Sequence, residues 1–408
     1  MKNNKTGKLV LFGAGKIGRS FIGQLFSRGG YEVVFVDVNK IIIDELNRRK
    51  AYNVVIKGEK EEFLKIENVR GVYAGDEQKV VSEIVSAEII AVSVGQNGLS
   101  EIIPLIAKGL FARFSLDKNI AIDIILAENL RNAAEYMSET LRIHLPQEYP
   151  LEERVGLVET SIGKMVPIIS KKDMETDILQ VFAEPYNTLI LDKLAFKNPI
   201  PKIEGLAPKE NMKAWVDRKL FIHNLGHATA AYLGYLTHPE SSFLYEVLSD
   251  SQLKDEVRKT MLQAAHILLL KYPGEFTIES LTIHIDDLLE RFQNKALGDT
   301  LFRVGCDLQR KLGAEDRLAG AIHLARELNL SYHLILKALI CGCHFRATDE
   351  LGYRLPSDNE FMEIYSRGIE AVLTSICGFN KIIHKEIIAD AIVLNNFIGF
   401  NSYNPLSD

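Results

Sequence analysis

The spacing of apolar and polar positions changes character once along the chain. In the first half, short apolar runs alternate with glycine-rich turns and with segments of helical spacing, a pattern typical of buried parallel strands connected by helices. From Lys209 onward the apolar positions recur only at helical spacing. The pattern predicts an α/β domain over residues 1–205 and an all-α domain over residues 206–408, with Asn198-Pro199-Ile200-Pro201 marking the boundary.

The elements expected from this pattern are short in the first half and long in the second. Strands are predicted at 8–12, 31–36, 52–56, 63–69, 89–94, 119–126, 155–160, 164–169, 181–185 and 189–192. The third and fourth strands are expected to form a hairpin, and the last two a second pair. Helices are predicted at 20–28, 42–49, 102–111, 214–236, 240–248, 252–271, 278–292, 300–304, 317–328, 332–343, 358–376 and 385–396.

Composition narrows the class of protein. The chain has 408 residues, 47% hydrophobic and 25% charged, which is typical of a globular protein of two domains. A net charge of −6 argues against broad nucleic-acid binding. The N-terminal apolar run is too short for a secretory signal, and no stretch reaches the roughly 18 apolar residues of a transmembrane helix. We therefore expect a cytoplasmic protein with no membrane partner.

The chain contains four cysteines, and none precedes Cys306. This low count is typical of a reducing compartment, in which the thiols remain free. Cys341-Gly342-Cys343-His344 has the residue types of a metal site, but no second cluster completes four ligands. We interpret these cysteines as core residues and predict no metal.

A glycine-rich turn follows the first predicted strand and opens the first predicted helix. It reads Gly13-Ala14-Gly15-Lys16-Ile17-Gly18, and Asp37 ends the next strand. Strand, Gly-x-Gly-x-x-Gly, helix, strand and acid form the fingerprint of a Rossmann-type dinucleotide-binding domain. Gly13 makes the tight turn, Gly15 lets the backbone reach the pyrophosphate, and Gly18 lets helix and strand pack closely.

Asp37 distinguishes between the two nicotinamide cofactors. Its carboxylate is expected to accept hydrogen bonds from the adenosine ribose and to repel a 2′-phosphate, so the sequence predicts NAD rather than NADP. Lys16 and Arg19 offset this repulsion only if they reach that phosphate. The alternative is that Asp37 caps the following helix.

Two further strand ends are candidates for the site. Val94 and Gly95 end one apolar strand, at the edge of an open α/β sheet where cofactors bind, and are assigned to the cofactor site. Glu128 and Asn129 end the next strand, which makes Asn129 a site candidate. The alternative is that Asn129 caps a helix starting at Leu130.

The most unusual polar stretch runs from Lys219 to His227. At about 100° per residue, its polar side chains share an arc of about 140°, and the opposite side is apolar. They are Lys219, His223, Asn224 and His227. A Lys with a lowered pKa acts as a general base, and Asn and His stabilise a developing alkoxide. Lys219 and His227 are about 12 Å apart along a helix, which suits an elongated substrate, and Gly226 permits close approach of a neighbouring element.

Together, the dinucleotide motif, the helical second half and Lys-x4-Asn-x2-His resemble the polyol-specific long-chain dehydrogenase/reductase family over nearly the whole chain. The motifs that resemble this family are Phe12-Gly13-Ala14-Gly15-Lys16-Ile17-Gly18-Arg19, Asp37-Val38-Asn39, Glu128-Asn129, Arg218-Lys219-Leu220-Phe221, Gly226-His227-Ala228, Ala231-Tyr232-Leu233-Gly234 and His344-Phe345-Arg346. They are most similar to those of members that act on mannitol 1-phosphate. The resemblance implies metal-independent, NAD-dependent oxidation of that substrate to fructose 6-phosphate, and the reverse reaction.

The same resemblance implies a catalytic set made of a general base, two amides at the reacting oxygen and a histidine that positions the substrate. These are Lys219, Asn129 with Asn224, and His227. His223 stands where the family has an uncharged residue, and we interpret it as a packing residue; the alternatives are a substrate contact and a lowered Lys219 pKa. Lys164 replaces an Arg, which predicts a local change in substrate contacts.

A phosphorylated substrate requires a cationic pocket, in which Arg is preferred for its forked hydrogen bonds. The candidates are Arg303, Arg310, Lys311, Arg317, His344 and Arg346, and the alternative for each is ordinary surface charge.

Four other kinds of protein are alternatives, and the sequence argues against one of them. Hexuronate reductases and dehydrogenases of unphosphorylated polyols use the same catalytic residues with a different distal pocket. β-Hydroxyacid dehydrogenases place Asn four residues after Lys, so Asn224 and His227 argue against them. A non-catalytic NAD-binding sensor would not need Lys219.

Overall fold

The computed structural model describes residues 7–58, 60–128, 130, 132–167 and 177–402. The chain divides into two compact units, Met1–Trp215 and Val216–Asp408. The division falls after residue 205 because strand β11 (Leu206–Lys209) pairs with β10 (Leu189–Asp192) in the sheet of the first unit.

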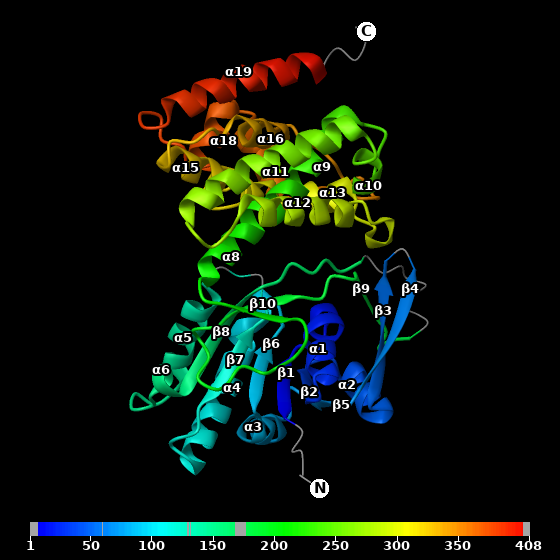
Figure 1. Cartoon of the computed structure of the whole chain (residues 1–408), viewed down its shortest axis with the longest axis vertical. Helices are drawn as coiled ribbons and strands as arrows, with labels where there is room; N and C mark the ends of the chain where they lie inside the picture. The colour runs from blue at the N-terminus through cyan, green and yellow to red at the C-terminus, as the bar shows by residue number, and fades with distance from the viewer. Residues whose placement is uncertain (1–6, 59, 129, 131, 168–176, 403–408) are drawn as a thin grey trace. The chain divides into compact units, whose positions relative to one another are not determined.

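An eight-stranded mixed sheet forms the centre of the first unit (Figure 1). Its order is β11-β10-β8-β7-β6-β1-β2-β5, and the six strands from β8 to β5 are parallel. β10 runs antiparallel to β8, and β11 runs parallel to β10. The remaining bounds are β1 (Lys8–Phe12), β2 (Glu32–Asp37), β5 (Val69–Tyr73), β6 (Ile89–Val92), β7 (Ile122–Leu126) and β8 (Val155–Ser161). This is the Rossmann-type arrangement predicted from the sequence.

Both faces of this sheet are buried, which explains the continuous apolar runs. On β1, Leu9 and Leu11 pack with the first helix, whereas Val10 and Phe12 pack with α3, α4 and α5. The helical segments of this unit are η1 (Gly18–Gly23), α1 (Gln24–Arg28), α2 (Lys40–Arg49), α3 (Glu77–Ser86), α4 (Gln96–Leu116), α5 (Ala133–His144) and α6 (Leu151–Arg154). The π-helical turn η1 continues directly into α1.

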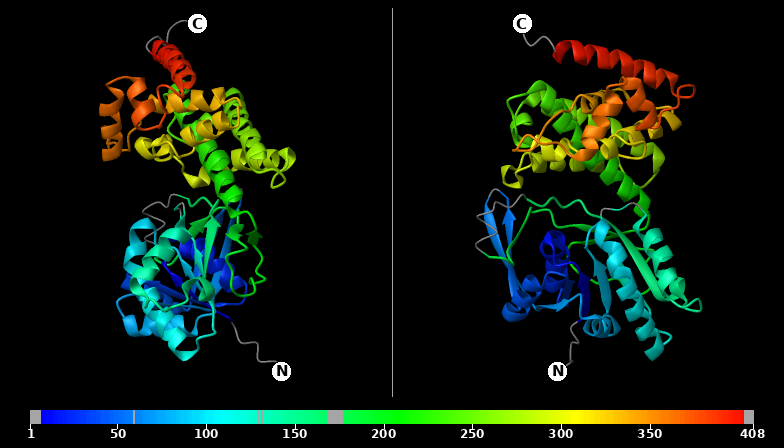
Figure 2. Two further views of the ribbon diagram at one scale, coloured as in Figure 1. Left: turned by 90° about the vertical axis from the view of Figure 1, so that its left-hand side faces the viewer. Right: turned by 180° about the vertical axis from the view of Figure 1, so that it is seen from behind.

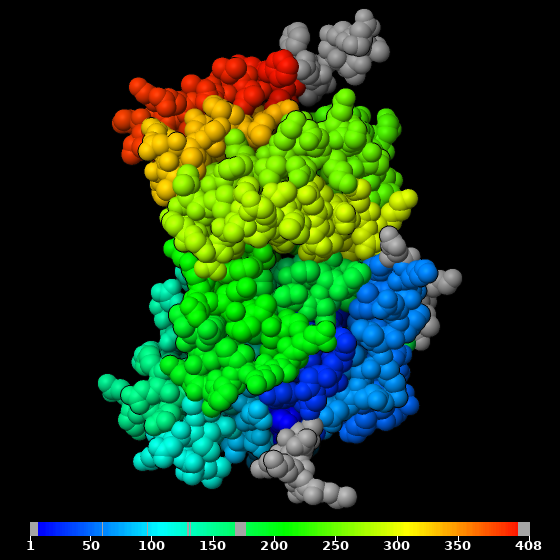
Figure 3. Space-filling model, in the orientation of Figure 1, coloured from blue at the N-terminus to red at the C-terminus, as the bar shows by residue number. Residues whose placement is uncertain are grey.

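A second sheet joins β4 (Glu61–Glu67), β3 (Ala51–Lys57) and β9 (Val181–Ala183). The predicted hairpin is confirmed, because β3 and β4 pair antiparallel. Blue residues of this region form part of the surface of the first unit in Figure 3. The predicted pairing of 181–185 with 189–192 is wrong, since β9 pairs with β3 and β10 pairs with β8 and β11.

The strand predicted over 164–169 is also wrong for its described part, because residues 164–167 form no strand; residues 168 and 169 lie outside the described ranges. Lys164 is buried, and its amine donates to the Tyr186 carbonyl at 2.7 Å and to Asn187 Oδ1 at 3.0 Å. Pro167 cannot donate a ladder hydrogen bond. Apolar spacing alone does not reveal such local bonding.

The second unit is helical, as predicted (Figure 2). Helix α8 (Met212–Arg218) leads into η2 (Lys219–Asn224), and α9 (Leu225–Thr237) follows directly. The other helices are α10 (Leu244–Val247), α11 (Ser251–Lys271), α12 (Ile278–Phe292), η3 (Lys295–Leu297), α13 (Leu301–Gly305), α14 (Leu308–Lys311), α15 (Ala319–Glu327), α16 (His333–Cys343), α17 (Pro356–Tyr365), α18 (Ile369–Ser375) and α19 (Lys385–Ser402).

Two details of this unit differ from the predicted helices. The segment 358–376 forms two helices, because Gly368 takes a φ of 103° between them. The terminal helix α19, red in Figure 3, lies on the surface of the helical unit and packs against α16 and α18. Within the described ranges, none of the helices is long and apolar enough to cross a membrane.

Candidate active site

The glycine turn after β1 has the geometry that its sequence predicts. Gly13 has a φ of 98°, and a Cβ there would lie 2.2 Å from the Ser93 carbonyl oxygen. A Cβ on Gly18 would lie 2.1 Å from the Gly13 carbonyl oxygen, so this position also admits only glycine. A Cβ on Gly15 would meet nothing within 4 Å. Gly15 is therefore the open side of the turn, where a pyrophosphate can approach the backbone.

The side chain of Asp37 forms a hydrogen bond with the glycine turn. Its Oδ2 accepts the Ala14 backbone N–H at 2.7 Å, and its Oδ1 accepts that of Asn39 at 2.7 Å. Asn39 caps α2, with its side chain accepting the Ile42 N–H at 3.2 Å. The alternative interpretation of Asp37 as the helix cap is therefore wrong.

The cations nearest the glycine turn differ in their exposure. Arg19 is buried and donates to the carbonyls of Ala14, Ile178 and Leu179. Its guanidinium is therefore occupied by backbone carbonyls. Lys16 is exposed, and Ile17 is half-buried.

The turn after β6 is held by a residue from the next strand. Glu128 is buried, and its Oε1 accepts the N–H groups of Val94 at 2.6 Å and Gly95 at 3.0 Å. Burial raises the pKa of this carboxyl, although the two backbone hydrogen bonds act in the opposite direction. Val94 and Gly95, which the sequence assigned to the cofactor site, thus both donate their backbone N–H groups to Glu128. Asn129 lies outside the described residues.

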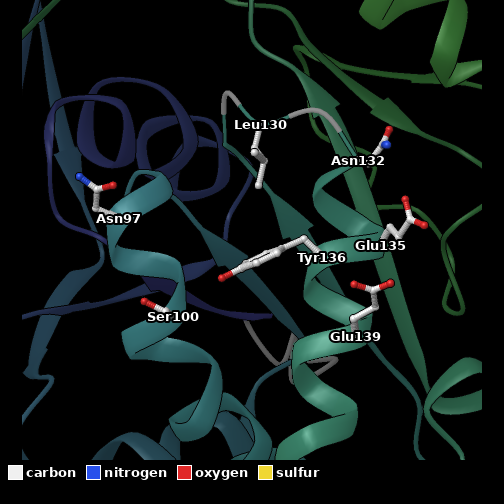
Figure 4. Close-up of a pocket in the computed structure, with 7 residues that line it drawn as sticks. All are labelled: Asn97, Ser100, Leu130, Asn132, Glu135, Tyr136 and Glu139. Atoms are coloured by element: carbon white, nitrogen blue, oxygen red, sulfur yellow. The ribbon is translucent and has the colours of Figure 1, made fainter. Parts of the chain in front are cut away.

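A cavity of about 680 Å³ lies between α4 and α5 (Figure 4). Tyr136 extends from α5 toward Ser100 on α4. The cavity is lined by Asn97, Ser100, Leu130, Asn132, Glu135, Tyr136 and Glu139. Two of the described lining residues, Glu135 and Glu139, are carboxylates.

In the second unit, Lys219 opens a π-helical turn that ends at Asn224. A regular α-helix would separate these two residues by about 140° around its axis. A π-helix bonds residue i to i+5, so Asn224 follows one turn after Lys219 and on the same side. The α-helical spacing on which the predicted polar face rested is therefore wrong for this turn. Such turns are frequent at functional sites.

Lys219 is a half-buried residue, and charged side chains act on its amine. Burial, followed by the positive charge of Arg317, lowers the pKa of Lys219 to about 8. Arg310 acts in the same direction, whereas Asp316 opposes it. A substantial fraction of this amine is neutral near physiological pH, which a general base requires.

His223 is a packing residue, as the sequence analysis favoured. It is buried, and its ring centroid lies 5.6 Å from that of Phe292. Burial lowers its pKa well below the usual range, so the ring is neutral and does not repel the Lys219 ammonium. Gly226 allows α11 to pack closely against this helix, because a Cβ at this position would lie 2.5 Å from Met261 Sδ.

His227 is held from two sides. Its ring stacks on Phe292, with centroids 4.7 Å apart and an interplanar angle of 20°. Its Nε2 lies 3.2 Å from Oδ2 of the buried Asp299, which also pairs with Arg303.

The predicted phosphate-binding cations fall into two groups. Arg310 pairs with Asp307 at 2.5 Å and with Asp316 at 3.5 Å, and it acts on Lys219 electrostatically. Arg317 is buried, donating to Asp316 and to the Asn224 carbonyl. Lys311 is buried too, with its amine 2.7 Å from the Val304 carbonyl, and burial lowers its pKa to about 8.

Arg346 belongs to a different group. It donates to the Cys343 and Phe345 carbonyls and lies over the Tyr365 ring. Nε2 of His344, at the C-terminal end of α16, lies 3.0 Å from Oδ1 of Asn395 on α19. This contact joins the two helices. Burial lowers the pKa of both Arg346 and His344.

The cysteines are free thiols, and Cys341, Cys343 and Cys377 are buried. Within the part of the chain that the structure describes, no group of three or more His, Cys, Asp or Glu side chains is arranged to hold a metal.

Sequence reasoning missed the residues that hold the candidates in place. Glu128 was noted only as a neighbour of Asn129, and Asp299 and Phe292 were not noted at all. Asp299 lies more than 70 residues from His227, and its only local signal is the adjacent helix cap Thr300. No spacing rule predicts contacts at such separation.

Comparison with known proteins gives a consistent classification. Residues 7–205 match the mannitol dehydrogenase Rossmann domain, and residues 211–388 match the mannitol dehydrogenase C-terminal domain. A substrate-free D-sorbitol dehydrogenase crystal structure is similar, with a TM-score of 0.82, 18% identity, and coverage of 97% of this chain and 94% of that chain. Mannitol 2-dehydrogenase from Pseudomonas fluorescens, in a ternary complex with NAD and D-mannitol, gives a TM-score of 0.75 and 16% identity, covering 98% of this chain and 93% of that chain. At these identities the two structures support the fold, and the two domain matches, which together span most of the sequence, show that the chain belongs to the mannitol dehydrogenase family.

Proposed function

We propose that this member of the family is an NAD-dependent polyol-phosphate dehydrogenase that oxidises mannitol 1-phosphate to fructose 6-phosphate and catalyses the reverse reaction. The observation that carries the chemistry is the Lys219 amine, whose pKa is lowered to about 8 by burial and by Arg317. It shares a π-helical turn with Asn224, and His227 follows on the next turn.

In the proposed reaction, the amine of Lys219 accepts the proton of the substrate hydroxyl. The side-chain amides of Asn224 and Asn129 donate hydrogen bonds to the oxygen as negative charge develops on it. His227 binds a neighbouring hydroxyl. NAD, held by the glycine turn and Asp37, would supply the hydride acceptor for the same carbon; with the proton taken by Lys219, the carbinol would lose two electrons and two hydrogens and become a ketone. Lys219 then carries the proton, which passes to solvent before the next turnover.

The preference for NAD is supported by the surroundings of Asp37. Its carboxylate sits at the end of β2 beside the glycine turn, where an adenosine ribose binds in this fold. Arg19 is occupied by backbone carbonyls. The residues proposed to hold the cofactor are those predicted from the sequence: Gly13, Ala14, Gly15, Lys16, Ile17, Gly18 and Asp37, with Val94 and Gly95 shaping the site through Glu128.

The proposal of a phosphorylated substrate is supported by two exposed arginines. The side chain of Arg303 is 47% exposed and that of Arg310 is 54% exposed. Arg303 connects through Asp299 to His227, and Arg310 acts on Lys219. Both therefore interact, directly or through one residue, with a residue proposed to be catalytic. Lys311 is bonded to the backbone and is the weaker candidate.

Initial rates of NADH formation with mannitol 1-phosphate, mannitol and a hexonate, repeated with NADP, test this proposal. Preferential turnover of mannitol 1-phosphate with NAD is expected, and Arg303→Ala or Arg310→Ala should then raise KM for the phosphate ester. Arg258→Ala, which removes a half-buried arginine paired with Asp286, is the control.

Other outcomes assign the protein differently. Turnover of mannitol or a hexonate alone would retain the Lys219 chemistry and reject the phosphate pocket. A hexonate carries a carboxylate, which Arg also binds through forked hydrogen bonds. NAD binding without turnover of any substrate would favour the non-catalytic sensor.

A further inference from the structure

A single buried carboxylate joins two of the residues assigned to the substrate. The side chain of Asp299 is 5% exposed. It pairs with Nε2 of His227 at 3.2 Å through Oδ2, and with the guanidinium of Arg303 through Oδ1. The side chains of His227 and Arg303 are more exposed, at 19% and 47%. The Asp299 carboxylate is therefore more deeply buried than the two side chains that it contacts, His227 and Arg303.

The backbone of Asp299 is fixed independently of these side chains. Its carbonyl accepts the Leu244 N–H at 2.9 Å, and Leu301 donates to the Ser242 carbonyl at 2.8 Å. Thr300 forms an isolated β-bridge with Phe243 and caps α13. The start of α13 is thus anchored to a neighbouring segment, and the carboxylate has a defined position from which to act.

The ionisation state of Asp299 decides which ring nitrogen of His227 carries the proton when the ring is neutral. Burial alone would raise its pKa, but the hydrogen bond from His227 and the charge of Arg303 leave it below the usual range. An ionised carboxylate only accepts hydrogen bonds. His227 must therefore donate its Nε2–H, and the ring presents Nδ1 on its other side. When the ring is neutral, Nδ1 is a hydrogen-bond acceptor.

Ring rotation is restricted as well. A 180° flip of the imidazole would break the hydrogen bond between Nε2 and Asp299. Phe292, which is 1% exposed, stacks on the ring and limits intermediate orientations. Asp299 and Phe292 together select one tautomer and one orientation, which is how a carboxylate behind a functional histidine commonly acts.

We propose that Asp299 is a positioning residue, which holds His227 as the Nε2–H tautomer with Nδ1 directed to a substrate hydroxyl and aims Arg303 at the anionic end of the same substrate. This inference rests on the proposed function for the identity of the substrate. It adds that recognition of the hydroxyl and of the anionic group depends on one shared carboxylate. A substrate that lacks the anionic group should therefore respond less to loss of Asp299.

Histidine-selective ¹⁵N NMR tests the tautomer without any substrate. Comparison with His227→Gln assigns the signal among the ten histidines of the chain. In the wild-type protein with a neutral ring, Nε2 should be protonated and Nδ1 unprotonated. Asp299→Ala should shift the signals toward a mixture of tautomers. A protonated Nδ1 in the neutral wild-type ring would overturn the proposal, whatever the enzyme oxidises.

Kinetics test the consequence for turnover. Asp299→Ala should lower kcat/KM for mannitol 1-phosphate by roughly tenfold to a hundredfold, the usual effect of losing a charged hydrogen bond. Asp299→Asn keeps an acceptor oxygen and should recover part of this loss. In a double-mutant cycle, Asp299→Ala should have a smaller effect in a His227→Ala background than in the wild type, because only the contact with Arg303 then remains to be lost.

Thr300→Ala is the matched structural control. It removes the hydroxyl that accepts the Arg303 N–H at 3.1 Å and weakens the start of the same helix, but leaves the carboxylate in place. We expect kcat/KM to stay near the wild-type value in this variant. An equal loss in Thr300→Ala, or full additivity of Asp299→Ala with His227→Ala, would show that Asp299 has only a structural role.

Discussion

The pH dependence of polyol oxidation follows from the surroundings of Lys219. The pKa of this amine falls from the ordinary 10.5 to about 8, with burial as the largest cause and Arg317 as the second. At pH 7 a group with a pKa of about 8 is roughly 10% neutral, whereas an unperturbed lysine is roughly 0.03% neutral. The shift therefore supplies about three hundred times more free base, equivalent to about 3 kcal/mol.

The sign of the effect differs between the two directions. Oxidation requires the neutral amine, so kcat/KM should rise about tenfold per pH unit and level off above about pH 8. Reduction requires the ammonium, so its rate should be constant at low pH and fall as the pH rises through about 8. Initial rates from NADH absorbance, from about pH 6 to about pH 10 at constant ionic strength, measure both limbs.

Substitution of Arg317 tests whether its positive charge lowers the pKa of Lys219. Arg317→Gln removes the positive charge, so the Lys219 pKa should rise and the oxidation limb should move to higher pH. Arg317→Lys retains the charge and should leave the limb near its wild-type position. The reasoning is refuted if the wild-type limb lies near the pKa of an ordinary lysine, or if the Arg317→Gln profile is unchanged.

Four further predictions concern the cofactor turn and the packing behind His227. Gly15→Ala should keep the wild-type melting temperature but weaken NAD binding at least tenfold in a fluorescence titration, because its Cβ meets no protein atom yet occupies the path of the pyrophosphate; an unchanged Kd would contradict this. Gly18→Ala, whose Cβ would lie 2.1 Å from a carbonyl oxygen, should instead lose about 1–3 kcal/mol in urea unfolding, and a loss below that range would show that the turn relaxes. Asp37→Ala should reduce the ratio of kcat/KM for NAD over NADP, whereas an unchanged ratio would remove Asp37 from the ribose site. Phe292→Ala should cost about 3–5 kcal/mol of unfolding free energy, because the ring is 1% exposed and stacks on His227, and a minor loss would show that the site collapses around the gap.

Local chemistry explains what the sequence predicted correctly. The strands β1 and β2, the glycine turn and Asp37 are close in sequence, and Gly13 and Gly18 each have a steric reason in the neighbouring backbone. Helix α12 lies at its predicted bounds, since its apolar spacing is regular and Thr277 caps it. The set of Lys219, Asn224 and His227, inferred from helical spacing and the family resemblance, stays a prediction.

Long-range pairing and departures from the α-helical period explain what was missed. β9 and β10 were expected to pair because they are adjacent in sequence, but each finds a partner in an earlier strand. The π-helical turn at Lys219 breaks the assumption of about 100° per residue, on which the predicted arc rested. Asp299 and Glu128 act on residues that are distant in the chain, and only coordinates reveal such contacts.

The comparison of wild-type protein with Lys219→Met tests the central claim most directly. NAD-linked oxidation of mannitol 1-phosphate should be readily measured in the wild type and fall by at least about a thousandfold in kcat in the variant, a loss in the range expected for a general base. NAD affinity should remain unchanged, since the proposed cofactor residues belong to the glycine turn and Asp37. A variant that binds NAD and turns over at the wild-type rate would contradict the account.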